Sequence, residues 1–523
     1  MTKNSKLVWV VVFLLGWLFD FLFWKKQAGI NFAIFLTLCL LGGFLLLLSN
    51  GLKPASKSLW LIIPFAFFAT ITFMRQEPLT LFLAFTFSII SLGLLTVTYL
   101  GGRWTRYSLF DYFNKFWLLI GSIILRPYGY FKQTPIDMAG VRRLPIKPVV
   151  RGLMIAVPVV VFFAVLLAAG DLVFRQKIND TFDFFSLERI PEYIFRLIII
   201  LFWAYVLIGV FLHAASQSRD GNLIGEDEPV IKHFLGFTEA AIVLGSVIFL
   251  FLLFVIVQFR YFFGGEVNIG VEGYTYSQYA RSGFSELITV AFFSLLMILG
   301  LGTITRREDD RQKRAYSGLS VALVALVIVI LVSAYQRLNL AIDWHGFSRL
   351  RLYPRVFLIW VGILFVAVIA LEIIRRERYF AFAALLASIG FAVSLSLINV
   401  DASIVRHNVY RTIEGKYINV NFLTTLSPDA VPALVDGYMD QSLPITTHQG
   451  VGAALLCYIH SDMYQDYSTP DWRSFNYSQW AAINALNRVQ ADIQGYNVNE
   501  EVSPIQVETP NHELYVCSNE KIR

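Results

Sequence analysis

The sequence has few charged residues for its length. Asp, Glu, Lys and Arg make up 15% of its 523 residues, whereas 56% are hydrophobic and the mean hydropathy is +0.60. A soluble domain carries roughly 25% charged residues, and one globular core has too little interior volume to bury such an apolar excess. The shortage of charge therefore excludes a soluble globular protein and predicts an integral membrane protein that has the lipid bilayer as its partner.

The motifs of common enzyme chemistry are also missing. Gly264-Gly265 lacks the Lys-Ser/Thr pair of a phosphate-binding loop, and neither an HExxH run nor a GxSxG elbow occurs. The histidines have no metal-ligand spacing, and Asp343 beside His345 is weak evidence for a catalytic pair. We therefore expect no metal and no cofactor, and the catalytic residues of any enzyme activity stay unknown.

Cysteine is scarce, with three residues in the chain. Cys39 lies in an apolar segment and is interpreted as a packing residue. Cys457 and Cys517 lie in the polar C-terminal region, where an extracytoplasmic compartment would permit a disulfide. Because spacing alone does not show that they approach within bonding distance, a disulfide and two unpaired thiols both stay open.

Long apolar segments make up most of the chain. A spanning helix needs about 20 mostly apolar residues, and eleven segments qualify: Leu7–Phe23, Ile30–Leu48, Leu59–Met74, Leu79–Leu100, Gly152–Ala169, Tyr193–His213, Thr238–Phe259, Phe284–Thr303, Ala315–Tyr335, Pro354–Ile373 and Tyr379–Ile398. The first has no small-residue cleavage site after it and is interpreted as a retained helix. Leu109–Leu125 is interrupted by polar residues, which favours an interfacial or re-entrant helix.

The loop charges predict the orientation. The segment 101–151 carries nine Lys/Arg and two Asp/Glu, and the turns near Arg306 and Arg375 are also basic. Cytoplasmic loops are enriched in Lys and Arg, and alternation of eleven spans puts these three loops on one side. The N-terminus is therefore expected in the cytoplasm and the C-terminus outside, although Lys25-Lys26 disagrees. The basic excess of these loops is assigned to the positive-inside bias, so we expect no nucleic acid as a partner.

The predicted organisation has four parts. Residues 1–100 form a four-helix membrane segment, 101–151 a basic cytoplasmic loop, 152–398 a seven-helix core and 399–523 a polar extracytoplasmic domain. The last part is acidic, with 14 Asp/Glu against 7 Lys/Arg. Ser427-Pro428-Asp429 predicts a helix start, and a second helix is expected near 474–493. The fold class is thus an all-α polytopic membrane protein with a small, mainly helical C-terminal domain.

Polar residues gather in the loops that alternation puts outside. Arg offers a planar donor fork for phosphate or carboxylate groups, so a converging set of Arg and Tyr would suit an anionic ligand. Such residues are also common interfacial anchors, and both interpretations stay open. The candidates are Tyr261, Tyr276, Tyr279, Arg281, Arg349, Arg351, Tyr353 and Arg406.

Charged residues in or near spans form a second group of candidates. They are costly in lipid and mark functional sites by default, although residues at helix ends reach water easily. The group comprises Asp20, Arg196, Glu239, Glu286 and Glu372.

Four stretches in order carry a resemblance. They are Tyr261–Gly265, Thr275–Phe284, Arg349–Tyr353 and Leu426–Leu434, the last reading LSPDAVPAL. They resemble a bacterial membrane-protein family, domain of unknown function family 4173, which is related to family 4153. Gln278 departs from the acid usual at that position. The resemblance covers about Val150 to Tyr438 and implies no activity, because the family has none assigned.

Three functions fit these features. The first is an envelope-associated sensor or scaffold, whose outer Arg/Tyr-rich surface binds an unidentified protein partner or anionic ligand. The second is a transporter or lipid-handling permease, which helix breaks near the midplane of the membrane would support. The third is a membrane enzyme acting on a lipid-linked substrate. The outward position of the motif residues favours the first.

Overall fold

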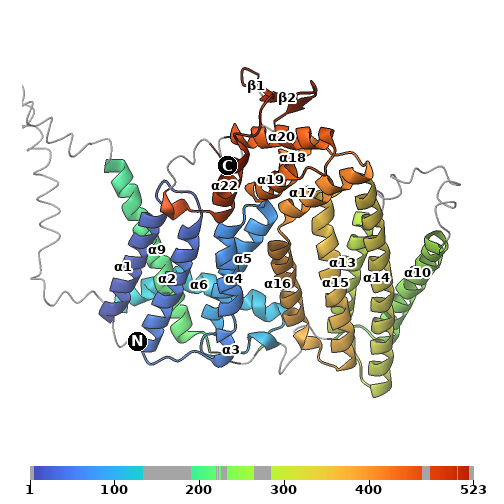
Figure 1. Cartoon of the computed structure of the whole chain (residues 1–523). Helices are drawn as coiled ribbons and strands as arrows, with labels where there is room; N and C mark the ends of the chain where they lie inside the picture. Colours follow the sequence, from blue (N-terminus) through green and yellow to red (C-terminus); the bar gives the residue numbers. More distant parts are fainter. Residues whose placement is uncertain are drawn as a thin grey trace, which may run out of the picture. The chain divides into compact units, whose positions relative to one another are not determined.

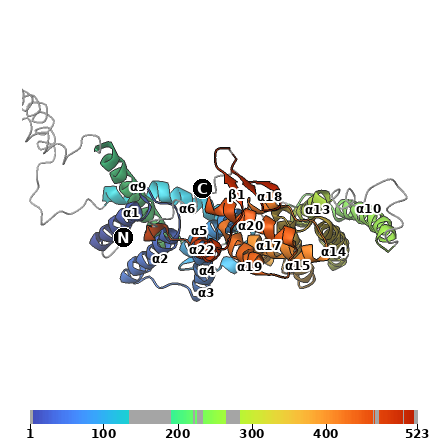
Figure 2. The same ribbon diagram turned by 45° about the horizontal axis from the view of Figure 1, so that its top comes forward.

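The computed structural model describes residues 5–133, 190–219, 221, 223–224, 233–263, 284–461, 464, 471–502 and 504–517 (Figures 1 and 2). Within these residues ten segments are long and apolar enough to cross a membrane. The predicted span Gly152–Ala169 lies outside the described residues. The chain is therefore a multi-pass, mainly α-helical membrane protein. It divides into two compact units, which are described separately.

The first unit contains α1 (Ser5–Phe23), α9 (Ile190–Ser216), most of α2 (Ile30–Ser49) and the later part of α6 (Leu109–Gln133). Helix α1 packs closely on α9. A Cβ on Gly16 would lie 2.5 Å from the carbonyl oxygen of Ile200, so this close approach requires glycine. α6 is not among the candidate spans, and its predicted interfacial position stays a prediction.

The second unit contains the other spanning helices: α4 (Ile62–Met74), α5 (Pro78–Thr98), α10 (Phe237–Phe263), α13 (Phe284–Ile304), α14 (Asp310–His345), α15 (Arg349–Ile373) and α16 (Phe380–Ile398). The short helix α3 (Ser56–Leu59) precedes α4 and shares its span. Neighbours pack in the order α4, α5, α16, α15 and α14, and α10 and α13 both pack on α14 (Figure 1).

Helix α14 is longer than its predicted span. We expected a polar loop after Tyr335 and a span from Pro354, but α14 continues to His345 and α15 begins at Arg349. Gly346 ends α14 with a φ of +79°, a conformation that side chains other than glycine rarely adopt. The candidates Arg349, Arg351 and Tyr353 therefore lie in the first turns of a helix and not in a loop.

The C-terminal region is mainly helical and follows α16 directly. Its helices are α17 (Val400–Tyr410), α18 (Val420–Leu423), α19 (Val431–Met439), α20 (Ile445–Ile459) and α22 (Tyr477–Val489), with the 3-10 turns η5 (Arg411–Glu414), η6 (Pro428–Ala430) and η8 (Trp472–Ser474). Strands β1 (Asn497–Asn499), β2 (Gln506–Glu508) and β3 (Leu514–Val516) form an antiparallel sheet in that order. Strands β2 and β3 thus form a hairpin near the end of the described residues.

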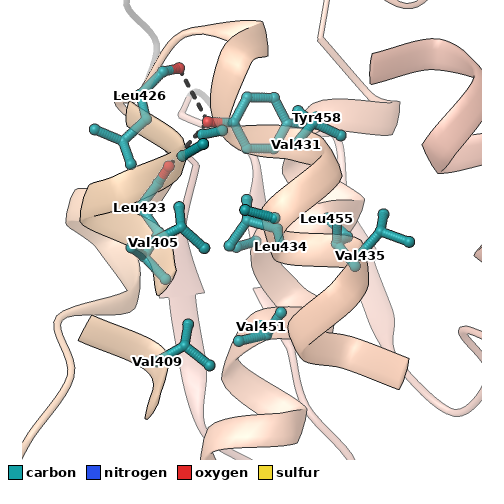
Figure 3. Packing of buried hydrophobic residues seen from close by; sticks show 14 of the residues in the cluster. Val405, Val409, Leu423, Leu426, Val431, Leu434, Val435, Val451, Leu455 and Tyr458 are labelled. Atoms are coloured by element: carbon teal, nitrogen blue, oxygen red, sulfur yellow. Dashed lines mark hydrogen bonds between the residues drawn. The ribbon is translucent and has the colours of Figure 1, made fainter. Parts of the chain in front are cut away.

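One hydrophobic core joins the C-terminal helices to the membrane helices. Val431, Leu434 and Val435 are buried on one face of α19, as their spacing predicts (Figure 3). The same core includes Leu352 of α15 and Leu395 of α16. The C-terminal helices are therefore packed on the spanning helices of their unit, and the predicted boundary of a C-terminal domain at residue 399 stays a prediction.

Tyr458 fixes the centre of this core. Its hydroxyl donates to the carbonyl oxygens of Leu423 and Leu426, both at 2.9 Å (Figure 3). Cys457, the residue before it, forms a disulfide with Cys517, and the Cα atoms are 5.3 Å apart. The bond ties α20 to the end of β3.

The basic loops of the second unit meet at the end opposite to the C-terminal helices. Arg378 donates to the carbonyl oxygen of Arg106 at 2.9 Å, and Arg307 pairs with Glu377 at 3.2 Å. The turn Glu377–Tyr379 (η4) between α15 and α16 therefore lies beside both other basic segments of this unit. Alternation of the spans predicts this grouping.

Candidate functional site

The α4–α5 turn supplies the first part of the site. Pro78 occupies the first turn of α5, and the Glu77 carboxylate caps it by accepting from the backbone N–H groups of Leu79 at 2.9 Å and Thr80 at 2.8 Å. Glu77 is buried, and it also accepts a hydrogen bond from the hydroxyl of Tyr353 in α15. The cap thus connects α5 to α15.

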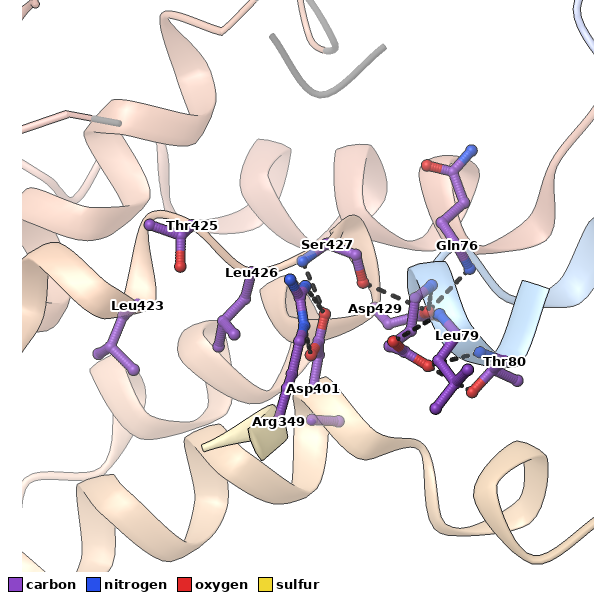
Figure 4. Close-up of polar contacts among 12 residues, drawn as sticks. Gln76, Leu79, Thr80, Arg349, Asp401, Leu423, Thr425, Leu426, Ser427 and Asp429 are labelled. Atoms are coloured by element: carbon purple, nitrogen blue, oxygen red, sulfur yellow. Dashed lines mark hydrogen bonds and ion pairs between the residues drawn. The ribbon is translucent and has the colours of Figure 1, made fainter. Parts of the chain in front are cut away.

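Asp429 of η6 binds the same turn. Its Oδ2 accepts from the N–H groups of Gln76 at 2.8 Å and Glu77 at 2.9 Å, and Arg75 lies 3.7 Å from its Oδ1 (Figure 4). Burial raises the pKa of Asp429, and the two N–H groups and Arg75 oppose that rise. This carboxylate joins the start of α19 to the α4–α5 turn.

Asp401, in the first turn of α17, binds the same segment as Asp429, through the backbone N–H of Ser427. It is 0% exposed and accepts from Arg349 Nε at 2.8 Å, Arg349 Nη2 at 2.6 Å and the N–H of Ser427 at 2.7 Å (Figure 4). Such a fork-to-carboxylate pair is among the stronger charged contacts in proteins. Arg349 thereby connects α15 to the segment that carries Asp429.

We call this set the signature network: Arg75, Gln76, Glu77, Arg349, Tyr353, Asp401, Ser427 and Asp429. It brings together two of the motif stretches singled out in the sequence, Arg349–Tyr353 and Leu426–Leu434. Both aspartates accept their hydrogen bonds from groups of the protein itself. These hydrogen bonds and ion pairs attach the C-terminal helices to α4, α5 and α15.

A second contact holds the corner after α14. Asn408 of α17 exchanges two hydrogen bonds with the backbone of Phe347, at 2.8 and 2.9 Å. Arg411 donates to the carbonyl oxygen of Asp343 at 2.8 Å, and this hydrogen bond satisfies one of the carbonyl groups that lack a partner within α14 at its end. A Cβ on Gly346 would lie 2.3 Å from Arg411 Nη1, so this contact also requires glycine.

The other ligand candidates do not all join the network. Arg351 donates to the carbonyl oxygen of Gly346 at 2.9 Å, and Arg406 is exposed on α17. The side chain of Tyr261 and the residues Tyr276, Tyr279 and Arg281 lie outside the described residues. Whether the eight candidates converge on an anionic ligand stays a prediction.

The membrane-charge candidates differ in their surroundings. Asp20 is buried in the first unit and pairs with Arg196 at 2.6 Å. Glu239 accepts from the N–H of Gly236 at 2.8 Å in the first turn of α10, and Glu286 is exposed in the first turn of α13. Glu372 is buried near the end of α15 and accepts from Ser317 Oγ at 2.7 Å.

Sequence reasoning missed Arg75 and Glu77. The pair Glu77-Pro78 carried a usable signal, because an acid followed by proline predicts a helix start. Nothing in the sequence predicted that this cap would meet Asp429, which is 352 residues away. Among the described residues, no group of three His, Cys, Asp or Glu side chains could hold a metal ion.

The comparisons with known proteins identify the family. The model of the family described as Domain of unknown function (DUF4153) matches residues 62–437, a range that contains every member of the signature network. No curated protein and no solved structure matches the chain. The finer assignment to family 4173 stays a prediction, since the match is to the related family. The chain therefore belongs to the DUF4153 family.

Proposed function

We propose that the protein is a scaffold of the bacterial cytoplasmic membrane that presents its C-terminal helices to a protein partner outside the cytoplasm. The signature network carries this proposal. It uses the family-like motif residues to fix the C-terminal helices on the spanning helices. A fixed surface serves a scaffold, and it would serve equally a sensor that transmits partner binding to the membrane helices.

The sidedness follows from charge. Arg106, Arg307 and Arg378 lie at one end of the second unit, and the C-terminal helices lie at the other. Lys and Arg favour the cytoplasmic side, so we place the C-terminal helices in the extracytoplasmic space. Alternation of the predicted spans along the chain then places the N-terminus in the cytoplasm. The disulfide between Cys457 and Cys517 suits the oxidising conditions there.

Exposed apolar residues supply a surface for the partner. Tyr410, Ile413 and Met439 are large, exposed side chains of the C-terminal helices. Helix α17 packs on α19, and Tyr410 lies close enough to Asp440 to interact with it electrostatically, which places the end of α17 near Met439. We call Tyr410, Ile413 and Met439 the outer patch. Exposed apolar side chains gathered in this way favour protein interaction, and the exposed Arg406 on α17 adds a charge at its edge.

The test uses a deletion strain scored for envelope integrity. Ile413→Asp and Met439→Asp place charges on the outer patch without touching the signature network. We expect both variants to reach the membrane in wild-type amounts and to fail to restore the envelope. The matched control is Leu514→Asp on β3, an equally exposed apolar residue of the same region, and it should restore the envelope in full.

Full complementation by both outer-patch variants would contradict the scaffold. A deletion strain with an intact envelope and altered metabolite uptake would favour the permease. Accumulation of one lipid-linked precursor would favour the enzyme. The envelope, metabolite and lipid measurements on one strain therefore separate the three functions.

A further inference from the structure

A cavity of about 490 Å³ lies at the basic end of the second unit. The ends of α13 and α15, the start of α14 and the start of α16 surround it, together with Ser108 and the first residues of α6. Clefts of 300 to 1,000 Å³ that are mostly apolar with a few polar groups are typical of small-molecule sites. The signature network lies at the other end of the same unit.

Two polar side chains of the cavity wall are available to a ligand. Tyr316 is 1% exposed, and its hydroxyl lies near the hydroxyl of Ser320 but makes no hydrogen bond of good geometry among the described residues. Glu372 is 8% exposed and receives one hydrogen bond, from Ser317. In the described part of the second unit no basic side chain pairs with Glu372. A buried carboxylate in a spanning helix is costly unless a cation or hydrogen-bond donors compensate its charge.

The arginines near the cavity are already engaged. Arg378 pairs with Asp111 at 3.5 Å and donates to the carbonyl oxygen of Arg106. Arg307 pairs with Glu377 and lies over the ring of Tyr316, with its guanidinium carbon 4.2 Å from the ring centre. The charge left over at the cavity is therefore that of a carboxylate, and the ligand that complements it is a cation.

The wall is polar near the helix ends and apolar further in. Glu372 is one residue from the end of α15, whereas Leu296 lies eight residues before the end of α13, about 12 Å inward at 1.5 Å per residue. Leu299 and Val368 line the cavity between these levels. The gradient matches a molecule with a polar head at the membrane surface and a hydrocarbon chain directed toward the bilayer centre.

We propose that this cavity binds one amphiphile that carries an ammonium group. The ammonium group donates to the carboxylate of Glu372 and the hydroxyl oxygen of Tyr316, and the chain lies along Leu296, Leu299 and Val368. An ammonium amphiphile can be a membrane lipid or a free long-chain amine. The two share the head that the cavity recognises, and binding probes can distinguish them.

The test measures binding to the purified, delipidated full chain by native mass spectrometry over a concentration series. The probes are lysophosphatidylethanolamine, dodecylammonium, dodecanol and lysophosphatidylglycerol. We expect saturable binding of one molecule per chain for at least one ammonium probe, and at least tenfold weaker binding of dodecanol and lysophosphatidylglycerol. Binding of lysophosphatidylethanolamine would assign a lipid, and binding of dodecylammonium alone would assign a free amine.

Two variants test the residues. Glu372→Gln should weaken binding of the ammonium probe by at least about tenfold, because a buried charge pair loses one charge. Its matched control is Glu239→Gln, a carboxylate in the first turn of α10 that does not line the cavity. Gly300→Leu fills the cavity, since a Cβ on Gly300 meets nothing within 4 Å. Gly245→Leu is its control, a helical glycine with equal free space outside the cavity wall.

Three results would overturn the proposal. They are unchanged affinity in Glu372→Gln, unchanged affinity in Gly300→Leu, and binding of lysophosphatidylglycerol as tight as that of the ammonium probes. Because Gly300→Leu enters open space, it is expected to fold and keeps the test valid even where Glu372→Gln does not fold. These results are independent of the scaffold, whose test uses the outer patch.

Discussion

The ion pair between Arg349 and Asp401 should be indispensable to the signature network. The Asp401 carboxylate is 0% exposed, and two of its three hydrogen bonds come from the Arg349 guanidinium. Arg349→Ala leaves the buried charge with the N–H of Ser427 alone. We expect the C-terminal helices to lose their attachment to α15 as a result.

The cost follows from burial. Removing one partner of a buried pair costs about 3–5 kcal/mol, because the remaining charge is left without compensation. The side chain of Arg349 is 24% exposed, so water can replace part of the lost contact, and we expect about 3 kcal/mol. The comparison is Lys313→Ala, which breaks a pair whose side chains are 46% and 72% exposed and should cost less than about 1 kcal/mol.

The assay is equilibrium unfolding of the full chain in detergent, followed by limited proteolysis of the C-terminal helices. Arg349→Ala with Asp401→Asn completes the cycle, since a neutral amide is cheaper to bury than an unpaired carboxylate. The double variant should recover more than about 1 kcal/mol of the loss. A cost for Arg349→Ala equal to that of Lys313→Ala would refute the reasoning.

Three further predictions concern the same unit. Gly346→Ala should cost at least about 2 kcal/mol in thermal unfolding, because of the positive φ and the approach of Arg411, whereas Gly318→Ala in open space should leave stability unchanged or slightly higher. Because burial raises the pKa of Asp429 above its ordinary 3.8, the folded state binds this proton more tightly than the unfolded state. The resulting stability is present below 3.8 and is lost as the pH rises through the folded-state pKa, and Asp429→Asn should flatten that part of the pH profile of unfolding. Reduction of the Cys457–Cys517 disulfide, which joins residues 60 apart, should cost up to about 4 kcal/mol, and Cys39→Ser should not change this sensitivity to reductant.

Much of the fold was predictable, because hydrophobic length alone identifies spanning helices. All ten described spans fall on predicted segments, and the buried face of α19 follows from the spacing of Val431, Leu434 and Val435. The extension of α14 past Tyr335 was not predictable from hydropathy. Its residues 336–345 mix polar and apolar side chains, and Arg411 stabilises its end from far along the chain.

Only some members of the site were predictable from the sequence. The motif resemblance selected Arg349, Tyr353 and the segment around Asp429, whereas the predicted position of Arg349 and Tyr353 near outer loops suggested an open ligand surface. In the structure the anion that Arg349 binds is the carboxylate of Asp401, a residue of the protein itself. Sequence spacing carries no information on such pairing between distant segments, and the cap at Glu77 became meaningful only once α5 lay beside α15 and η6.

The central claim is that the C-terminal helices lie at the outer end of a membrane-spanning unit whose basic end faces the cytoplasm. Cysteine labelling in intact cells tests it most directly, in a Cys39→Ser background with Leu514→Cys on β3 or Lys313→Cys at the basic end. A membrane-impermeant maleimide should label Leu514→Cys in intact cells and Lys313→Cys only after the cells are permeabilised. Labelling of Lys313→Cys in intact cells, or protection of Leu514→Cys until permeabilisation, would contradict the account.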